Sequence, residues 1–363
     1  MDELKRFIDI HIPISVCNLK CHYCYVPKAN KYGSERLEFP YSASHIRMAL
    51  SKRRLGGTCL FNVCGMGETL IPHETIDIVK ALLDEGHYVT IVTNGLLTNR
   101  FEELSKLSGE QLSRILFKFS LHWIELKRLN KKEIFAANVH MMQQVGASIT
   151  IELTANDETE LYINEIMEYT QQEFGAKCHI SIPRDESSTE FLLQSKHTID
   201  EFYDIWKVFN SELLDFKYSI LGKKRTEYCY AGEWSGLLNI QNGEWRSCYH
   251  SHFSENIFDD LDKPIPFVPV GRHCAIPHCF NGHSWLTLGD IPAINSHTYA
   301  DVRDRRCLDG THWLNQRYYD FISQKLQNNN TYPHSTYENI IFNMKKGHCY
   351  IKKGVKKIIG WNK

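Results

Sequence analysis

The chain has 363 residues and a formal net charge of −1, so its overall charge gives no attraction to nucleic acid or to an anionic membrane. Hydrophobic residues make up 42% of it, enough for a sizeable core, and no run reaches the roughly 18 consecutive apolar residues of a membrane span. The first residues mix acids and bases, so we expect no signal peptide and a cytoplasmic location. In a reducing compartment, clusters among the twelve cysteines indicate metal or redox chemistry.

Short apolar runs rich in Val, Ile and Phe alternate with amphipathic helical patterns over the first half of the chain. The runs predict six strands, at residues 7–14, 59–65, 88–94, 116–122, 148–153 and 178–183. The segments after them predict helices at 41–54, 71–86, 98–108, 124–145, 158–174 and 198–216. Six strand–helix repeats predict an α/β fold with a parallel sheet, a (β/α)6 barrel or part of one, with chemistry at the carboxyl ends of the strands.

Three cysteines with the spacing C-x3-C-x2-C follow the first predicted strand, in the stretch CNLKCHYC (17–24). Thiolates are soft ligands suited to iron–sulfur clusters or to zinc. A closed zinc site has four protein ligands, and no fourth cysteine lies nearby, although His22 is a candidate. A four-iron cluster on Cys17, Cys21 and Cys24 would instead leave one iron open to an exogenous ligand.

This loop, with the aromatic Tyr23 before its third cysteine, resembles the radical S-adenosylmethionine (SAM) enzymes. The resemblance implies a 4Fe-4S cluster on the three cysteines, whose open iron binds SAM. It also implies reductive cleavage of SAM to a 5′-deoxyadenosyl radical that takes hydrogen from an unactivated C–H bond. The electrons would come from an external flavodoxin- or ferredoxin-like donor. In such enzymes the cofactor supplies the chemistry, and the protein supplies placement and shielding.

The resemblance also implies contacts to SAM at the strand ends. CGMGET (64–69) resembles the family's Gly-Gly-Glu motif, in which glycine lets a ligand approach the backbone. The residues implied are Tyr23, Gly65, Gly67, Glu68, Thr93, Asn94, Ser120, His122 and Arg184. Two of these motifs have structural alternatives, since Asn-Gly is also a common turn and His122 is also interpreted as a satisfied core histidine.

Two side chains at the later strand ends are the catalytic candidates, Glu152 and Arg184. A carboxylate inside a barrel is costly unless it is paired or functional, so Glu152 is a candidate for binding substrate or SAM. Arg184 ends the sixth predicted strand, where a guanidinium suits the carboxylate of SAM or an anionic substrate. The alternative for Arg184 is a solvated surface charge.

A second set of cysteines begins in the stretch 229–248, which predicts a hairpin with its turn at 241–243. Cys229, Gly243 and Cys248 match the C-x(9–15)-G-x4-C start of the SPASM or twitch module of the radical SAM enzymes. The resemblance implies an auxiliary 4Fe-4S cluster on Cys229, Cys248, Cys274 and Cys279, with Cys307 as the alternative to the last ligand. The dense later cysteines of full SPASM are absent from the sequence, so the shorter twitch form fits better.

A zinc site is the alternative for this region, because five histidines crowd it: His250, His252, His273, His278 and His283. The remaining cysteines are interpreted as non-ligands, because most fall in predicted strands. They are Cys59, Cys64, Cys178 and Cys349.

We predict a radical SAM partial barrel at 1–221, a SPASM/twitch-like domain at 222–310, and a C-terminal helix with a basic tail at 311–363. Few residues precede the first strand, so we expect no leader-peptide recognition domain there. The implied function is a two-electron oxidation of a small sugar-, cyclitol- or nucleotide-like metabolite, assisted by the auxiliary cluster. The alternatives are a maturase that oxidises or cross-links a peptide side chain, and a non-catalytic iron–sulfur or zinc protein. The tail suits an anionic surface or is simply a solvated helical end.

Overall fold

The structure is a computed structural model. It describes residues 2–24, 38–186, 190–251, 253–272, 274–279 and 281–360, the last seven of these by their backbone. No helix in the described part of the chain combines the length and the apolar character that crossing a membrane requires.

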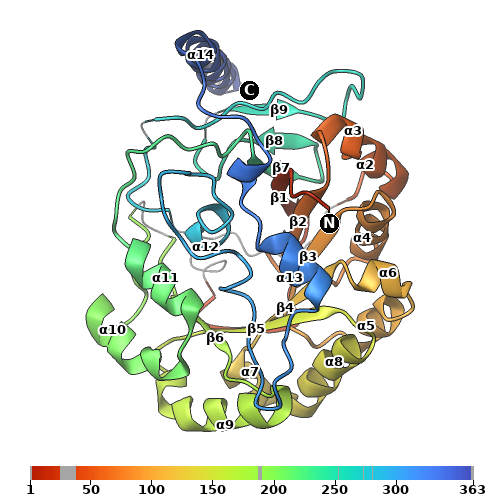
Figure 1. The fold of residues 1–363 in the computed structure, drawn as a ribbon, viewed down its shortest axis with the longest axis vertical. Coiled ribbons are helices and arrows are strands. Elements are labelled where there is room, and N and C mark those ends of the chain that lie inside the picture. Colours follow the sequence, from red (N-terminus) through yellow and green to blue (C-terminus); the bar gives the residue numbers. More distant parts are fainter. Residues whose placement is uncertain are drawn as a thin grey trace.

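A single open sheet of nine strands forms the centre, in the order β6-β5-β4-β3-β2-β1-β7-β8-β9 (Figure 1). The strands are β1 (Arg6–Ile12), β2 (Cys59–Gly65), β3 (Tyr88–Thr93), β4 (Ile115–Ser120), β5 (Ser148–Thr154), β6 (His179–Ser181), β7 (Ser235–Asn239), β8 (Glu244–Arg246) and β9 (Ser254–Asn256). β1 to β6 are parallel, and each is followed by helices before the next. The predicted α/β class and the partial six-strand barrel are confirmed.

The helices of the barrel lie on the outer side of the sheet (Figure 1). They are α2 (Ala43–Ala49), α3 (Lys52–Leu55), α4 (Glu74–Asp84), α5 (Thr98–Leu104), α6 (Gly109–Leu112), α7 (Trp123–Leu129), α8 (Lys132–Gln144), η1 (Thr159–Tyr162), α9 (Ile163–Phe174), α10 (Ile199–Trp206), η2 (Lys207–Phe209) and α11 (Glu212–Ile220). Three segments that are each predicted as one helix, 41–54, 124–145 and 198–216, are divided into shorter helices. The breaks after α7 and η2 fall at Asn130 and Asn210, which adopt the left-handed conformation that asparagine tolerates better than most residues.

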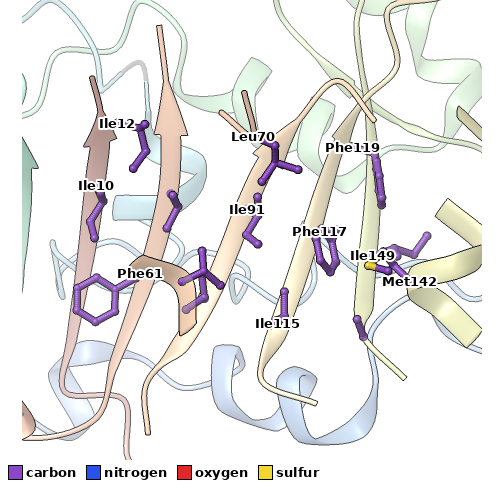
Figure 2. Close-up of a cluster of buried hydrophobic side chains, with 14 of the residues drawn as sticks. Ile10, Ile12, Phe61, Leu70, Ile91, Ile115, Phe117, Phe119, Met142 and Ile149 are labelled. Atoms are coloured by element: carbon purple, nitrogen blue, oxygen red, sulfur yellow. The ribbon is translucent and has the colours of Figure 1, made fainter. Parts of the chain in front are cut away.

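The outward side chains of β1 to β5 form the main core with the covering helices. Figure 2 shows part of this core, in which side chains such as Phe61, Ile91 and Phe117 come from neighbouring strands and Met142 of α8 lies beside Ile149. Burial of such large apolar side chains is the dominant stabilising contribution of the fold.

The inward face of the barrel changes character along the strands. Near their amino ends Phe7, Leu60 and Leu116 are apolar and fully buried, and they pack in a second core with residues from 285 to 326. This closing segment contains α12 (Gly282–Trp285), α13 (Gln316–Ile322) and η3 (Leu326–Asn328). Towards the carboxyl ends the inward residues are polar, as predicted for a site there.

The predicted boundary at residue 221 is crossed by the sheet itself. β7 pairs in parallel with β1, and β8 and β9 continue the sheet in antiparallel fashion. The predicted hairpin is formed by β7 and β8, with Gly243 in the left-handed conformation at its turn. The basic tail contributes most of α14 (Thr336–Gly360), which packs on this region through Lys346, whose Nζ donates to the Val270 carbonyl oxygen at 2.9 Å.

Candidate functional site

The loop after β1 gathers Cys17, Cys21 and Cys24 as partly exposed thiols. Burial raises the pKa of Cys17 to about 11 and that of Cys21 to about 12, and the neighbouring cysteines of the trio raise both further. The Leu19 amide also donates to Cys17 Sγ at 3.5 Å. Thiols that disfavour each other's ionisation fit a bound metal cluster, because its positive charge stabilises the thiolates together.

The Gly-rich loop after β2 lies directly against the chain that leads into the cysteines. A Cβ on Gly67 would collide with the Val16 carbonyl oxygen, and one on Gly65 with the side chain of Ile14. The Gly67 and Glu68 amides donate to the carbonyl oxygens of Ile14 and Val16, each at 3.0 Å. The chain's own backbone and side chain thus occupy the space that a Cβ would fill, which is a reason for glycine at both positions. The contact of these glycines with SAM stays a prediction.

Glu68 is buried and joins the ends of two strands. Its carboxylate accepts from the Thr93 hydroxyl at 2.7 Å, the Asn94 amide at 2.8 Å and the Leu70 amide at 3.1 Å. Burial raises the pKa of Glu68, while these hydrogen bonds oppose that shift. Asn94 reaches the cysteine loop, with Nδ2 3.8 Å from Cys17 Sγ. The structure thus gives Glu68 and Thr93 an internal role, and their contact with SAM stays a prediction.

Two more predicted SAM residues meet beside the loop. The Tyr23 hydroxyl lies 2.6 Å from His122 Nδ1, which ties the cysteine loop to the segment after β4. Burial lowers the pKa of His122 to about 4, so the imidazole is neutral at pH 7. Ser120 is half-buried at the end of β4 and pairs in register with Glu152 of β5.

The catalytic candidate Glu152 is held in a buried ion-pair group. Its carboxylate is paired with Lys118 at 2.9 Å and with the fully buried Arg303 from the closing segment. Pairing alone accounts for a buried carboxylate, so burial does not single it out as catalytic. A role of Glu152 in binding substrate stays a prediction.

Arg184 lies on the side of the second cysteine set. It is paired with Glu186 at 2.7 Å and donates to Asn281 Oδ1 at 3.2 Å. It also lines a small cavity together with Cys279. The contact of Arg184 with SAM stays a prediction.

All four cysteines of the second set line one cavity. They are Cys229, Cys248, Cys274 and Cys279. Burial is the main cause that raises the pKa of Cys248 to about 12 and that of Cys279 well above its usual value, and neighbouring thiols act in the same direction. Residues far apart in sequence thus bring four thiols to one site, which fits an iron–sulfur cluster.

The alternative ligand Cys307 lies elsewhere. Its buried Sγ donates to the Phe174 carbonyl oxygen at 3.4 Å and packs on Gly175, at the end of α9. It is not among the residues lining the cavity. The geometry favours Cys279 over Cys307.

The histidines that suggested a zinc site lie in different places. His278 lines the cavity, and His250 packs against Phe191. His252 and His273 lie outside the described residues.

Several polar residues of the interior were missed by the sequence analysis. Asp9 of β1 accepts from Asn62 Nδ2 at 2.8 Å and from the hydroxyl of Tyr249, which follows Cys248. The bond from Tyr249 links the barrel interior to the second cavity. The alternation in FIDIHI, with an aspartate among inward residues, was the available signal.

An open barrel of parallel strands with a three-thiol loop at its carboxyl end defines the class of protein. Residues 11–120 match the family model described as the Radical SAM superfamily. The match begins at the end of β1 and includes the three-cysteine loop and β2 to β4. Residues 11–120 are therefore similar to a radical SAM domain, which supports an enzyme rather than a non-catalytic protein.

Solved structures show the same fold. SuiB of Streptococcus suis bound to SAM has a TM-score of 0.52 and 14% identity, covering 72% of this chain and 66% of SuiB. SuiB bound to its precursor peptide SuiA has a TM-score of 0.50 and 15% identity, covering 72% and 64%. A histidine-tagged form of anSMEcpe with bound AdoMet has a TM-score of 0.49 and 16% identity, covering 72% and 77%. The chain thus spans slightly less than two thirds of SuiB. No curated protein sequence matches this chain.

Proposed function

We propose that this enzyme holds two 4Fe-4S clusters, one on Cys17, Cys21 and Cys24 and one on the cysteines of the second set. The observation that carries the proposal is that the four cysteines implied by the resemblance to the SPASM/twitch module line a single cavity. The chemistry that the first cluster and SAM supply when bound is a 5′-deoxyadenosyl radical for removing hydrogen from an unactivated C–H bond. A second cluster on these cysteines would supply an acceptor for one electron, so that removal of a hydrogen atom by the radical, of that electron and of a proton by a base would amount to a two-electron oxidation of the substrate.

The chain's own residues confine and shape the reaction space. The apolar closing segment blocks the amino end of the barrel, so access is from the carboxyl end. Glu68 fixes the ends of β2 and β3, and Tyr23 holds the cysteine loop against His122. Fixed placement of this kind is how a protein directs a reactive cofactor.

We infer a small sugar-, cyclitol- or nucleotide-like substrate. Support comes from the polar interior, where Asp9, Lys118 and Glu152 lie on the inner face of the sheet and suit a ligand rich in hydrogen-bonding groups. An external flavodoxin- or ferredoxin-like protein would donate electrons, and the proposed location is the cytoplasm.

The second candidate is modification of a peptide side chain by a SPASM-type maturase. The SuiB complex with its precursor peptide favours it, because that protein shares the fold. The two candidates are separated by the substrate that stimulates SAM cleavage.

The test is anaerobic reconstitution of the full chain with iron and sulfide, followed by reduction in the presence of SAM. We expect 5′-deoxyadenosine from the wild type and none from Cys24→Ala. Cys178→Ala removes a buried thiol outside both sites and should keep the activity. Absence of deoxyadenosine from the wild type under every reductant tried would contradict the proposal. Separate metabolite and peptide fractions of a cell extract then show which one stimulates turnover.

A further inference from the structure

A second, smaller cavity lies beside the carboxyl end of β6. Its polar lining consists of Arg184, Lys217, His278 and Cys279, and aliphatic side chains complete it. We call it the Lys217 cavity. Cys279 and His278 also line the cavity of the second cysteine set, so the two spaces adjoin.

Lys217 of α11 is a buried lysine with no carboxylate partner among the described residues. Its side chain is 7% exposed, and its Nζ donates to Ser181 Oγ at 2.7 Å. The charged groups that act on it electrostatically are Lys118 and Arg184, and both are positive. Burial lowers the pKa of Lys217 well below its usual value, and these two cations lower it further. Buried cations in proteins are normally paired, so this arrangement is costly without a ligand.

The neighbouring cations are already paired elsewhere. Arg184 faces Glu186 at 2.7 Å, and Lys118 faces Glu152 at 2.9 Å. No described carboxylate therefore remains to neutralise Lys217.

A second polar group in the cavity also lacks a partner. His278 is 3% exposed, and its Nε2 is buried without a hydrogen bond to any described residue. Together with Lys217 it presents unsatisfied hydrogen-bonding capacity to one space. Buried polar groups nearly always have a hydrogen-bond partner, so a ligand that binds in this cavity would account for both side chains.

We propose that the Lys217 cavity binds an anionic group of the substrate, a carboxylate or a phosphate, through Lys217 and His278. This inference rests on the proposed function and deepens it by naming the substrate's charge. An anion supplies the missing countercharge, and bonds to charged donors are the stronger ones. Because the cavity shares Cys279 with the second cysteine set, the anionic group would anchor the substrate beside that set.

SAM also carries a carboxylate, which is the other source of such an anion. The predicted SAM residues around Cys17 lie on β2 to β4, whereas Lys217 and His278 lie beside β6. This separation favours the substrate as the source.

The test compares Lys217→Met with Lys223→Met, an exposed lysine in the same stretch of chain, in the reconstituted full-length enzyme. The probes are inorganic phosphate and acetate at fixed ionic strength, and the measurement is the melting temperature. We expect at least one anion to raise it for the wild type and Lys223→Met, but not for Lys217→Met. Without anion, Lys217→Met should melt above the wild type, because an unpaired buried charge is removed. The proposal is overturned if the anions raise the melting temperature of Lys217→Met as much as that of the wild type. It is also overturned if neither anion raises the melting temperature of the wild type and of Lys223→Met.

SAM affinity forms the second arm. Lys217→Met should bind SAM as tightly as the control Lys223→Met does. A loss of SAM affinity would assign the cavity to the carboxylate of SAM and overturn the substrate assignment. Failure of the wild type to cleave SAM would instead count against the proposed function. Anion binding is judged from the melting temperatures alone, so the two results are independent.

Discussion

At the scale of single residues, buried polar side chains in this protein hold the chain in place around the site. Glu68 is the clearest case, since all three of its hydrogen bonds come from the chain. His87 has the same role in the outer core. Its Nδ1 accepts from the Cys59 amide at 3.1 Å, and its Nε2 lies 2.9 Å from the Leu50 carbonyl oxygen. This pairing requires the neutral imidazole.

The free energy of unfolding should therefore decrease as the pH falls through the range in which His87 gains a proton. Burial lowers the pKa of His87 from 6.5 to about 4. The unfolded chain then binds a proton before the folded chain does, so stability present above pH 6.5 is lost on the way down to about pH 4. We expect a loss of about 1 kcal/mol between about pH 7.5 and about pH 5.5 in urea unfolding. His87→Gln should show a smaller loss, and the exposed His348→Gln should match the wild type. An equal loss in all three proteins would contradict this role.

The fourth auxiliary ligand gives a matched pair of cysteine variants. Cys279 lines the second cavity, whereas Cys307 packs against the end of α9. We expect Cys279→Ala to bind about four fewer iron atoms per chain, the content of one cluster, and Cys307→Ala to keep full iron. Metal analysis after reconstitution decides, and the reverse result would show that the fold around the cavity differs.

At the scale of elements, the sequence predicted the strands well, because alternation and Val, Ile and Phe enrichment mark β1 to β6 plainly. Helix ends were predicted less well. The helix expected to end at 216 continues to Ile220 as α11, and this difference concealed Lys217. With Leu213, Phe216 and Ile220 it forms one buried stripe, so a lysine in an apolar pattern was the signal.

The glycine loop after β2 provides a prediction at this scale. A methyl group on Gly67 would displace the segment that carries the cysteines, because it meets the Val16 backbone. Gly67→Ala should lower iron binding at the first site and deoxyadenosine formation with it. Gly109→Ala is the control, since a Cβ there meets nothing within 4 Å. Full iron content in Gly67→Ala would show that the loop tolerates the shift.

At the scale of the whole molecule, the sequence did not reveal how the C-terminal part completes the barrel. β7 extends the sheet beside β1, and the closing segment fills the amino end of the barrel. These contacts join residues more than 200 positions apart, such as Tyr88 and Phe321, whose rings stack at 3.6 Å. Periodicity within a segment carries no information about such partners. For the same reason Arg303, the partner of Glu152, had no signal.

Phe321→Ala tests the closing segment. The side chain is fully buried, so its loss should cost about 3–5 kcal/mol of unfolding free energy. Leu308→Ala is the control, because Leu308 is 79% exposed, and it should change stability by no more than about 0.5 kcal/mol. Equal small effects in urea unfolding would mean that the segment is not part of the cooperative core.

The central claim is that this chain is a two-cluster enzyme, and the iron and sulfide content of the reconstituted wild type tests it most directly. The account predicts about eight iron and about eight sulfide per chain, the content of two 4Fe-4S clusters. Replacing Cys229 and Cys248 together by alanine should halve both. A wild-type content of about four iron, or zinc in place of the second half, would contradict the account.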